Sequence, residues 1–324
     1  MKRLLEFWIK GKKHLRILEE KKDSISLSLF NLRKSVPSEF ARLPRSLDDI
    51  EFWKATEFRE FLLYTGVVVL KSNLSKEKYY HFLLLFVSIR ILCSNEVCNK
   101  YNNLASKLIR EFVENYSTIY RPQFINYNVH SLIHLSFFVR LYGPLDNFSA
   151  FKYENYLQTL KKSMKCCKYP LSEIKNKIIA LECEELKTIT PNKCILKYFK
   201  IDENLSNFEL TFYHQITLKS NNYVVCCKNI KNQFFILEND DIVIIKKIYK
   251  NNRDDVIKLS VVKLLSISDL FKLPVPSKLV GVFFVNTHNV SDLYEIIVNN
   301  IKFKCFFVQF PNNEGVIISL CHNV

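Results

Sequence analysis

The sequence predicts an α+β protein in which a mainly α-helical region comes first and a β-rich module follows. Through about residue 188, apolar residues recur at three- and four-residue intervals, as on one face of a helix. From about residue 208, short runs of β-branched and aromatic residues replace this pattern, as is typical of strands. We therefore expect a helical region over 1–188, a linker over 189–207 and a small barrel-like or SH3-like β module over 208–324.

Caps, periodicity and proline place the elements of the helical region. Ser46 and Ser75 each precede a helical pattern, because a serine hydroxyl can accept a hydrogen bond from a backbone N–H of the first turn. Pro37 and Pro44 indicate an extended segment, since proline disfavours helix at the residue before it. The expected helices are Leu4–Leu18, Ile25–Leu32, Ser46–Leu62, Ser75–Leu92, 97–116, 126–141, 148–165 and 170–187.

The β module is predicted from short runs with strand-like composition. Seven or eight such runs follow one another closely, which favours a small barrel or sandwich. The break between the two regions falls near Pro191. The expected strands are Phe208–Leu218, Tyr223–Asn229, Gln233–Leu237, Ile242–Tyr249, Val256–Leu264, Leu279–Val285, Phe303–Phe310 and Val316–Leu320.

Basic residues outnumber acidic ones along the chain. There are 47 Lys and Arg residues against 32 Asp and Glu, which gives a net charge of +15. Such an excess favours polyanions, of which nucleic acid is the commonest, so DNA is an expected partner. An AT-rich coding sequence explains the same bias, since Asn, Ile, Phe and Tyr are frequent together with Lys. Both interpretations stay open at this stage.

Cysteines and apolar segments indicate where the protein resides. The ten cysteines have no framework spacing, which favours free thiols in a reducing compartment. The N-terminus carries charges inside its apolar run and so differs from a signal peptide. The longest apolar stretch, Phe82–Cys93, is short and contains Arg90, so no membrane-spanning segment is expected. We expect a nuclear or cytoplasmic protein that is not secreted.

Three stretches of sequence are distinctive and follow one another in a fixed order. The first consists of Pro37–Leu47, Trp53–Arg59 and Phe61–Tyr64, the second is Asn128–Leu135, and the third is Tyr142–Tyr156. Together they resemble the C-terminal part of CACTA-like DDE DNA transposases, in particular insect-type copies. The resemblance covers about residues 1–185. The trailing β region more weakly resembles the small barrel that follows this segment in insect copies.

The resemblance implies the tail of an interrupted RNase H-like core. In that family two aspartates and one late glutamate hold two Mg²⁺ or Mn²⁺ ions for phosphoryl transfer, and Glu154 matches the glutamate. His130 and His134 match a histidine pair that completes a zinc site with a Cys-x-x-Cys motif. The family's aspartates and cysteines precede the segment that corresponds to Met1. We therefore expect a truncated copy that holds no cofactor of its own.

A purely structural role is the alternative interpretation for each of these residues. Glu154 lies at the edge of the apolar stripe of its expected helix, where it either faces a cleft or is an ordinary surface residue. His130 and His134, one helical turn apart, either bind zinc or are satisfied by neighbouring groups in the core. The basic residues that follow either contact a DNA backbone or form a solvated face, and they are Lys161, Lys162, Lys165 and Lys168.

Three functional hypotheses follow from the sequence. The favoured one is a transposon-derived fragment that is a catalytically inactive remnant of a transposase. The second is a domesticated module that binds DNA or protein through its basic surface. The third is a nuclease whose active site is completed in trans by another chain. The oligomeric state stays open.

Overall fold

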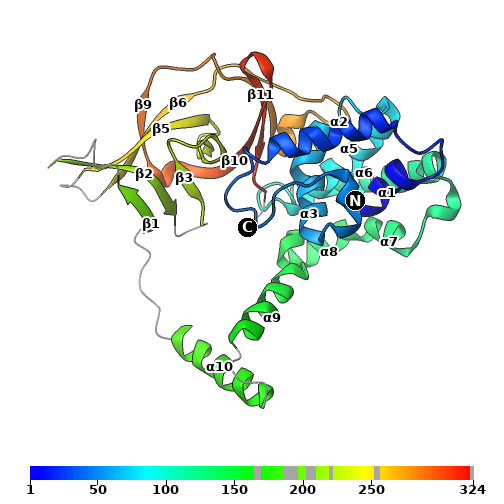
Figure 1. Cartoon of the computed structure of the whole chain (residues 1–324), viewed down its shortest axis with the longest axis horizontal. Helices are drawn as coiled ribbons and strands as arrows, with labels where there is room; N and C mark the ends of the chain where they lie inside the picture. The colour runs from blue at the N-terminus through cyan, green and yellow to red at the C-terminus, as the bar shows by residue number, and fades with distance from the viewer. Residues whose placement is uncertain (164–168, 186–195, 202–208, 219–221, 252–255, 322–324) are drawn as a thin grey trace.

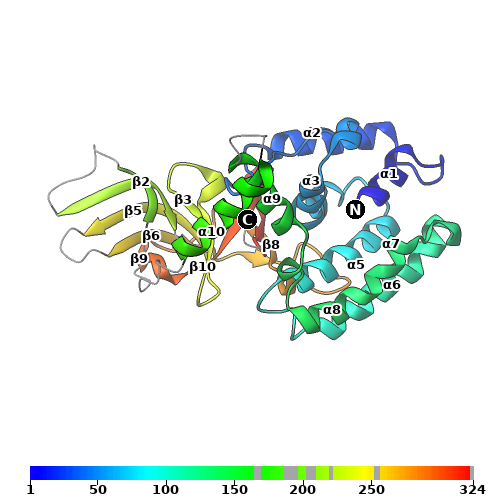
Figure 2. The same cartoon turned by 90° about the horizontal axis from the view of Figure 1, so that it is seen from below.

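The structure, a computed structural model, describes the chain except for residues 164–168, 186–195, 202–208, 219–221, 252–255 and 322–324. Helices form the first half and antiparallel strands form the second, so the predicted α+β class is confirmed (Figure 1). The helical half and the β module lie side by side in both views (Figure 1 and Figure 2), and helices α9 and α10 extend away from both (Figure 1). None of the described helices is long and apolar enough to span a membrane.

The helical half has the predicted order of elements, although several expected helices are shorter or divided. The expected helix over 126–141, for example, is divided into α7, a 3₁₀ turn and α8. The helices are α1 (Lys2–Lys10), α2 (Glu19–Leu32), α3 (Ala55–Glu60), α4 (Gly66–Val69), α5 (Lys76–Cys93), α6 (Asn102–Tyr120), α7 (Tyr127–His130), α8 (Leu135–Tyr142), α9 (Phe151–Ser163) and α10 (Pro170–Glu185).

Helix α5 is the central element of the helical half. Ser75 caps it as predicted, because its Oγ accepts a hydrogen bond from the backbone N of Lys78 at 3.3 Å. Every residue from His81 to Ser88 is buried, and α5 packs against α6. This part of α5 is buried on all sides and lies at the centre of the helical half, which explains its long apolar run.

The segment after Ser46 is a broken helix and not the single helix that its pattern predicts. Ser46 caps a 3₁₀ helix, η1 (Leu47–Phe52), by accepting a hydrogen bond from the backbone N of Asp48 at 3.1 Å. Trp53 then has extended backbone angles, and its indole N–H donates to the Ser46 carbonyl at 3.2 Å. Helix α3 follows and continues into a π-helical turn, η2 (Phe61–Thr65). Local periodicity does not predict such a break.

The strands of the β module form one antiparallel sheet. The order is β1-β2-β5-β4-β10-β11-β8-β7, with β3 paired to β2, and β6 placed between β5 and β9. The strands are β1 (Leu196–Ile201), β2 (Leu210–Leu218), β3 (Val224–Cys226), β4 (Phe234–Leu237), β5 (Ile242–Asn251), β6 (Ile257–Lys263), β7 (Ile267–Ser268), β8 (Val282–Asn286), β9 (Tyr294–Ile297), β10 (Ile301–Gln309) and β11 (Glu314–Ser319).

One strand of the sheet lies outside the expected bounds of the β module. Strand β1 lies inside the range 189–207 that was expected to be a linker, because it pairs with β2 through contacts that local composition does not encode. Among the described strands no pairing joins β7 to β1 or to β9, so the sheet is antiparallel and branched without a closed barrel being shown.

The central strands of the sheet are buried on both faces. In β4 and β5, Phe235 and Val243 belong to the large core that also contains the helices, whereas Phe234 and Ile244 belong to a second core within the β module. In the second core, the rings of Phe234 and Phe307 stack with centroids 4.2 Å apart. Because side chains alternate between the faces of a strand, one face of the sheet joins the helical half in a shared core. The two halves are therefore one packed unit.

Candidate functional site

Glu154, the expected late glutamate, lies on the first turn of α9. Its side chain is exposed, and its backbone N donates a hydrogen bond to the carbonyl of Ala150 at 3.1 Å. Among the described residues, no group of three His, Cys, Asp or Glu side chains is arranged to hold a metal ion. The structure thus places Glu154 as an exposed residue on the first turn of α9, the helix that extends from the body (Figure 1).

Arg59 of α3 holds the segment that leads into α9. Its guanidinium forms an ion pair with Asp146 and lies 5.4 Å from the centre of the Phe151 ring. Burial lowers the pKa of Arg59, but the surrounding acidic groups, of which Asp146 contributes most, together raise it above its usual value. A cavity of about 250 Å³ lies beside this contact, and Glu154 does not line it. The first and third distinctive stretches of the sequence are therefore in direct contact.

The other charged residues of the first stretch stabilise α3. Glu57 accepts hydrogen bonds from Arg45 Nε at 2.6 Å and Arg45 Nη2 at 2.8 Å, and from the backbone N of Lys54 at 2.8 Å. Burial raises the pKa of Glu57, but these hydrogen bonds outweigh it, so the pKa is lowered. A structural role, as an N-terminal cap and an ion pair, is therefore sufficient to explain Glu57 and its partners.

Glu60, one turn further along, is a buried acid that sequence analysis does not single out. Burial, assisted by the nearby charge of Glu57, raises the pKa of Glu60 to about 8. One of its carboxyl oxygens has no hydrogen-bond partner in the described structure. The residue is therefore mostly protonated at neutral pH.

His130 and His134 lie next to each other, but on two short elements instead of one helix. His130 ends α7, and His134 ends the 3₁₀ helix η4 (Ser131–His134). Their ring centroids are 5.8 Å apart in an edge-to-face arrangement, and both residues are exposed. The pair thus faces solvent and not the core. Two imidazoles supply half of a tetrahedral zinc site, and the described residues bring no third ligand to them.

Large apolar side chains are exposed on both α8 and α9. Within α8, the rings of Phe138 and Tyr142 stack with centroids 6.4 Å apart. The exposed side chains are Phe137, Phe138, Leu141, Tyr142, Tyr153, Tyr156 and Leu157.

The expected basic residues lie at the far end of α9. Lys161 and Lys162 are exposed on its last turn, whereas Lys165 and Lys168 lie outside the described residues. The basic excess belongs mainly to the first part of the chain. Residues 1–195 contain 32 Lys and Arg against 20 Asp and Glu, and residues 196–324 contain 15 against 12. An electrostatic attraction to a polyanion would therefore act chiefly on the helical half.

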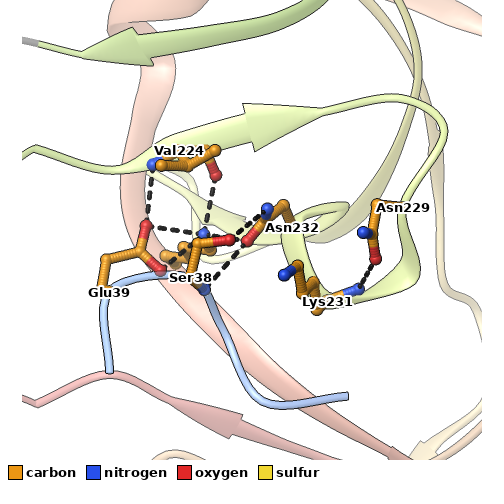
Figure 3. A network of polar contacts seen from close by, with 7 residues as sticks. Ser38, Glu39, Val224, Asn229, Lys231 and Asn232 are labelled. Carbon is orange, nitrogen blue, oxygen red and sulfur yellow. Dashed lines mark hydrogen bonds and ion pairs between the residues drawn. The ribbon is translucent and has the colours of Figure 1, made fainter. Parts of the chain in front are cut away.

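The first distinctive stretch also joins the two halves of the molecule. Lys304 of β10 is fully buried, and its Nζ donates to both carboxylate oxygens of Glu39 at 2.6 and 2.8 Å. Glu39 also accepts a hydrogen bond from the backbone N of Val224 at 2.7 Å, and Asn232 donates to Ser38 Oγ at 2.9 Å (Figure 3). Burial lowers the pKa of Lys304 to about 8, against the opposing effect of Glu39. A charge inside the apolar run 303–308 is the sequence signal that indicates this site.

Comparison with known proteins identifies only the β module. Residues 198–320 match a family described as a domain of unknown function (DUF8592). No curated protein and no solved structure matches the chain. The match begins within β1 and ends directly after β11, so the β module, from its first strand to its last, is similar to that family.

Proposed function

We propose that the chain is a transposase-derived protein without a working catalytic centre of its own. In this proposal the helical half is the tail of an interrupted RNase H-like core, and the β module is the small barrel-like or SH3-like module that follows it. The main support is the contact of Arg59 with Asp146 and Phe151, which packs two of the three distinctive stretches around the start of α9. Glu154 then marks the descent of the chain.

The surroundings of Glu154 support the absence of catalysis. Two-metal phosphoryl transfer needs several carboxylates that bridge and flank both ions. Glu154 is exposed, and the described residues assemble no set of three metal ligands. Mg²⁺ or Mn²⁺ at the carboxylates and Zn²⁺ at His130 and His134 are accordingly assigned to the ancestral enzyme.

Strand cleavage by the purified chain tests the proposal. A supercoiled plasmid and a labelled duplex are incubated with the chain and with Mg²⁺ or Mn²⁺. We expect no nicking above the level of a Glu154→Gln variant, which serves as the matched control. Metal-dependent nicking by the wild-type chain that disappears in Glu154→Gln would contradict the proposal.

A second candidate function is binding of DNA through the basic helical half. The concentration of positive charge in residues 1–195 and the exposed Lys161 and Lys162 favour it. The free thiols of the described cysteines fit a reducing compartment, so a nuclear or cytoplasmic location accompanies both candidates.

Fluorescence anisotropy with labelled duplexes at increasing KCl concentration tests DNA binding. If α9 contributes phosphate contacts, replacement of both Lys161 and Lys162 by Glu weakens binding and lowers the salt slope by about 2. The matched control replaces Lys246 and Lys247, an exposed pair on β5. Affinity that vanishes at moderate salt, shows no sequence preference and responds equally to both double variants would rule out a dedicated DNA-binding module.

A further inference from the structure

Arg90 of α5 is a buried cation whose hydrogen bonds all go to neutral acceptors. Its side chain lies between the two halves, and the residue is 2% exposed. Nε donates to the carbonyl of Val280 at 2.8 Å, and Nη1 donates to the carbonyl of Leu63 at 3.0 Å. Nη2 donates to the carbonyl and the hydroxyl of Ser319 at 2.9 and 3.2 Å.

No carboxylate of the described residues balances this charge. Buried arginine is almost always paired with an acid, because a charge removed from water is costly without an opposite charge. Here the rings of Tyr64 and Phe86, with centroids 5.6 and 5.8 Å from Cζ, provide the remaining stabilisation. Faces of aromatic rings compensate a cation only partly.

Arg90 lines a cavity of about 360 Å³ between the helical half and the β module. This size is within the range of small-molecule sites. Gly281 lies in the wall with a φ of +69°, and a Cβ there would be 2.1 Å from Ser319 Oγ and 3.4 Å from Arg90 Nη2. The left-handed backbone at Gly281 and the close approach of Ser319 therefore require glycine at this point of the wall.

The charges in the cavity wall leave a positive excess. Lys302 pairs with Glu96 at 3.2 Å and with Asp240 at 2.9 Å, and all three line the cavity. Arg90 and Lys278 are the remaining cations of the wall, and Lys278 Nζ donates to the carbonyl of Ile267. The two acids are thus already engaged by Lys302.

The rest of the wall is apolar and partly aromatic. Leu279, Phe283 and Phe303 line the same cavity as Arg90. Such a wall can pack against the flat face of an apolar or aromatic ring. A hydrated inorganic ion would make no favourable contact with these apolar side chains. The combination selects a ligand with an apolar ring and an anionic group.

We propose that the cavity binds a small organic anion with an aromatic or apolar ring, and that Arg90 is its counter-charge. The carboxylate or similar group approaches Arg90 from the side of Nη2, whose hydrogen bonds are less buried than those of Nε and Nη1, and it replaces the Ser319 hydroxyl, the more distant of the two acceptors on Nη2 at 3.2 Å. The ring lies against Phe283 and Phe303. Because both halves form the wall, the bound ligand stabilises their contact. The proposal is independent of the descent from a transposase.

Calorimetric titration of the full chain with 1-naphthoate and with 1-naphthamide tests this site. The two probes have the same ring system, and only the first carries a charge. Since charge-assisted hydrogen bonds are about twice as strong as neutral ones, we expect naphthoate to bind about tenfold more tightly or better. Equal affinity of the two probes, or no binding of either, would overturn the proposal.

Variants locate the binding without depending on Arg90, whose replacement endangers folding. Asn95 is exposed and lines the cavity, so Asn95→Trp should fill the entrance and abolish naphthoate binding. Asn99→Trp, in the same turn but outside the cavity wall, should bind like the wild type. Lys278→Met should weaken naphthoate severalfold and leave naphthamide unchanged. Naphthoate binding that persists in Asn95→Trp would place the ligand elsewhere and refute the assignment.

Discussion

Glu60 and His81 are ionisable side chains that the fold buries without an opposite charge among the residues that the structure describes. Burial raises the pKa of Glu60 to about 8 and lowers the pKa of His81 to about 4. His81 stacks on Phe112 with centroids 4.2 Å apart, and its Nε2 lies 2.9 Å from the Phe112 carbonyl. Both residues are therefore mostly neutral in the folded protein at pH 7.

These two shifts have opposite consequences for stability as the pH changes. The unfolded chain protonates His81 near pH 6.5 and the folded chain only near pH 4, so this residue lowers stability as the pH falls between these values. The folded chain keeps the proton of Glu60 up to about pH 8, whereas the unfolded chain releases it near pH 4.5. Glu60 therefore lowers stability as the pH rises from about 4.5 to 8.

Replacement of Glu60 by Gln should remove the loss of folding stability that Glu60 causes at higher pH. The variant should match the wild type near pH 4.5 and exceed its free energy of unfolding by roughly 2–4 kcal/mol at pH 9. Urea denaturation at several pH values measures the difference. Glu20→Gln, at an exposed position of α2, is the control and should change little at any pH. If the free energies of unfolding of Glu60→Gln and the wild type depend on pH in the same way, the Glu60 carboxyl ionises normally.

Single residues differ in how far the sequence predicts them. The caps at Ser46 and Ser75 follow from residues two or three positions away, so local pattern is sufficient. Arg90 and Lys304 are visible only as charges within apolar runs, because their partners lie 190 and 265 positions away. The exposure of His130 and His134 depends on what packs against α7, and spacing alone does not encode it.

At the scale of elements, one arginine contacts the segment from which α9 begins. Helix α9 extends from the body, and the residues at its base are held by Arg59 (Figure 1). Its apolar side chains Tyr153, Tyr156 and Leu157 are exposed. Tertiary packing supplies most of the stability of helices of this length, so a helix with so little burial should open more readily than α5.

Replacement of Arg59 by Met should loosen the base of α9. We expect the amide protection factors of residues 145–163 to fall by about tenfold, because the ion pair with Asp146 and the contact with Phe151 are lost. Hydrogen–deuterium exchange measures this effect. Arg33→Met is the matched control, since Arg33 also lies over a ring, that of Phe30, but on the exposed end of α2. Unchanged exchange across 145–163 would mean that other contacts hold α9.

Sequence patterns predict some of the helices and strands and miss others. The buried helix α5 and the strands β4, β5 and β11 lie close to their expected positions, since long apolar runs are strong signals. Strand β1 and the short strands β7 and β9 are not predicted, because pairing with distant neighbours creates them. The break at Trp53 depends on its indole hydrogen bond to Ser46, which no local rule anticipates.

At the scale of the whole molecule, buried charges join the two halves. Lys304 binds Glu39 at one point of the junction, and Arg90 binds Val280 and Ser319 at another. One core contains residues of both the helices and the sheet. The helical half and the β module should therefore unfold together, as a single cooperative unit.

Replacement of Lys304 by Met should uncouple the halves. It leaves the Glu39 carboxylate buried without a counter-charge, which costs roughly 3–5 kcal/mol. Differential scanning calorimetry should show one transition for the wild type and two for Lys304→Met. Lys302→Met, two positions along the same strand, breaks ion pairs that are more exposed and should cost about 1 kcal/mol or less. A single transition of unchanged midpoint in Lys304→Met would mean that the apolar core alone couples the halves.

Strand cleavage in trans is the most direct test of whether Glu154 can belong to a working metal site. The chain is mixed with a full-length CACTA-like transposase whose own late glutamate has been replaced by glutamine, and DNA nicking is measured with Mn²⁺. If Glu154 only marks descent, the mixture stays inactive. Restored nicking with the wild-type chain, but not with Glu154→Gln, would show that this residue completes an active site and would contradict the proposed function.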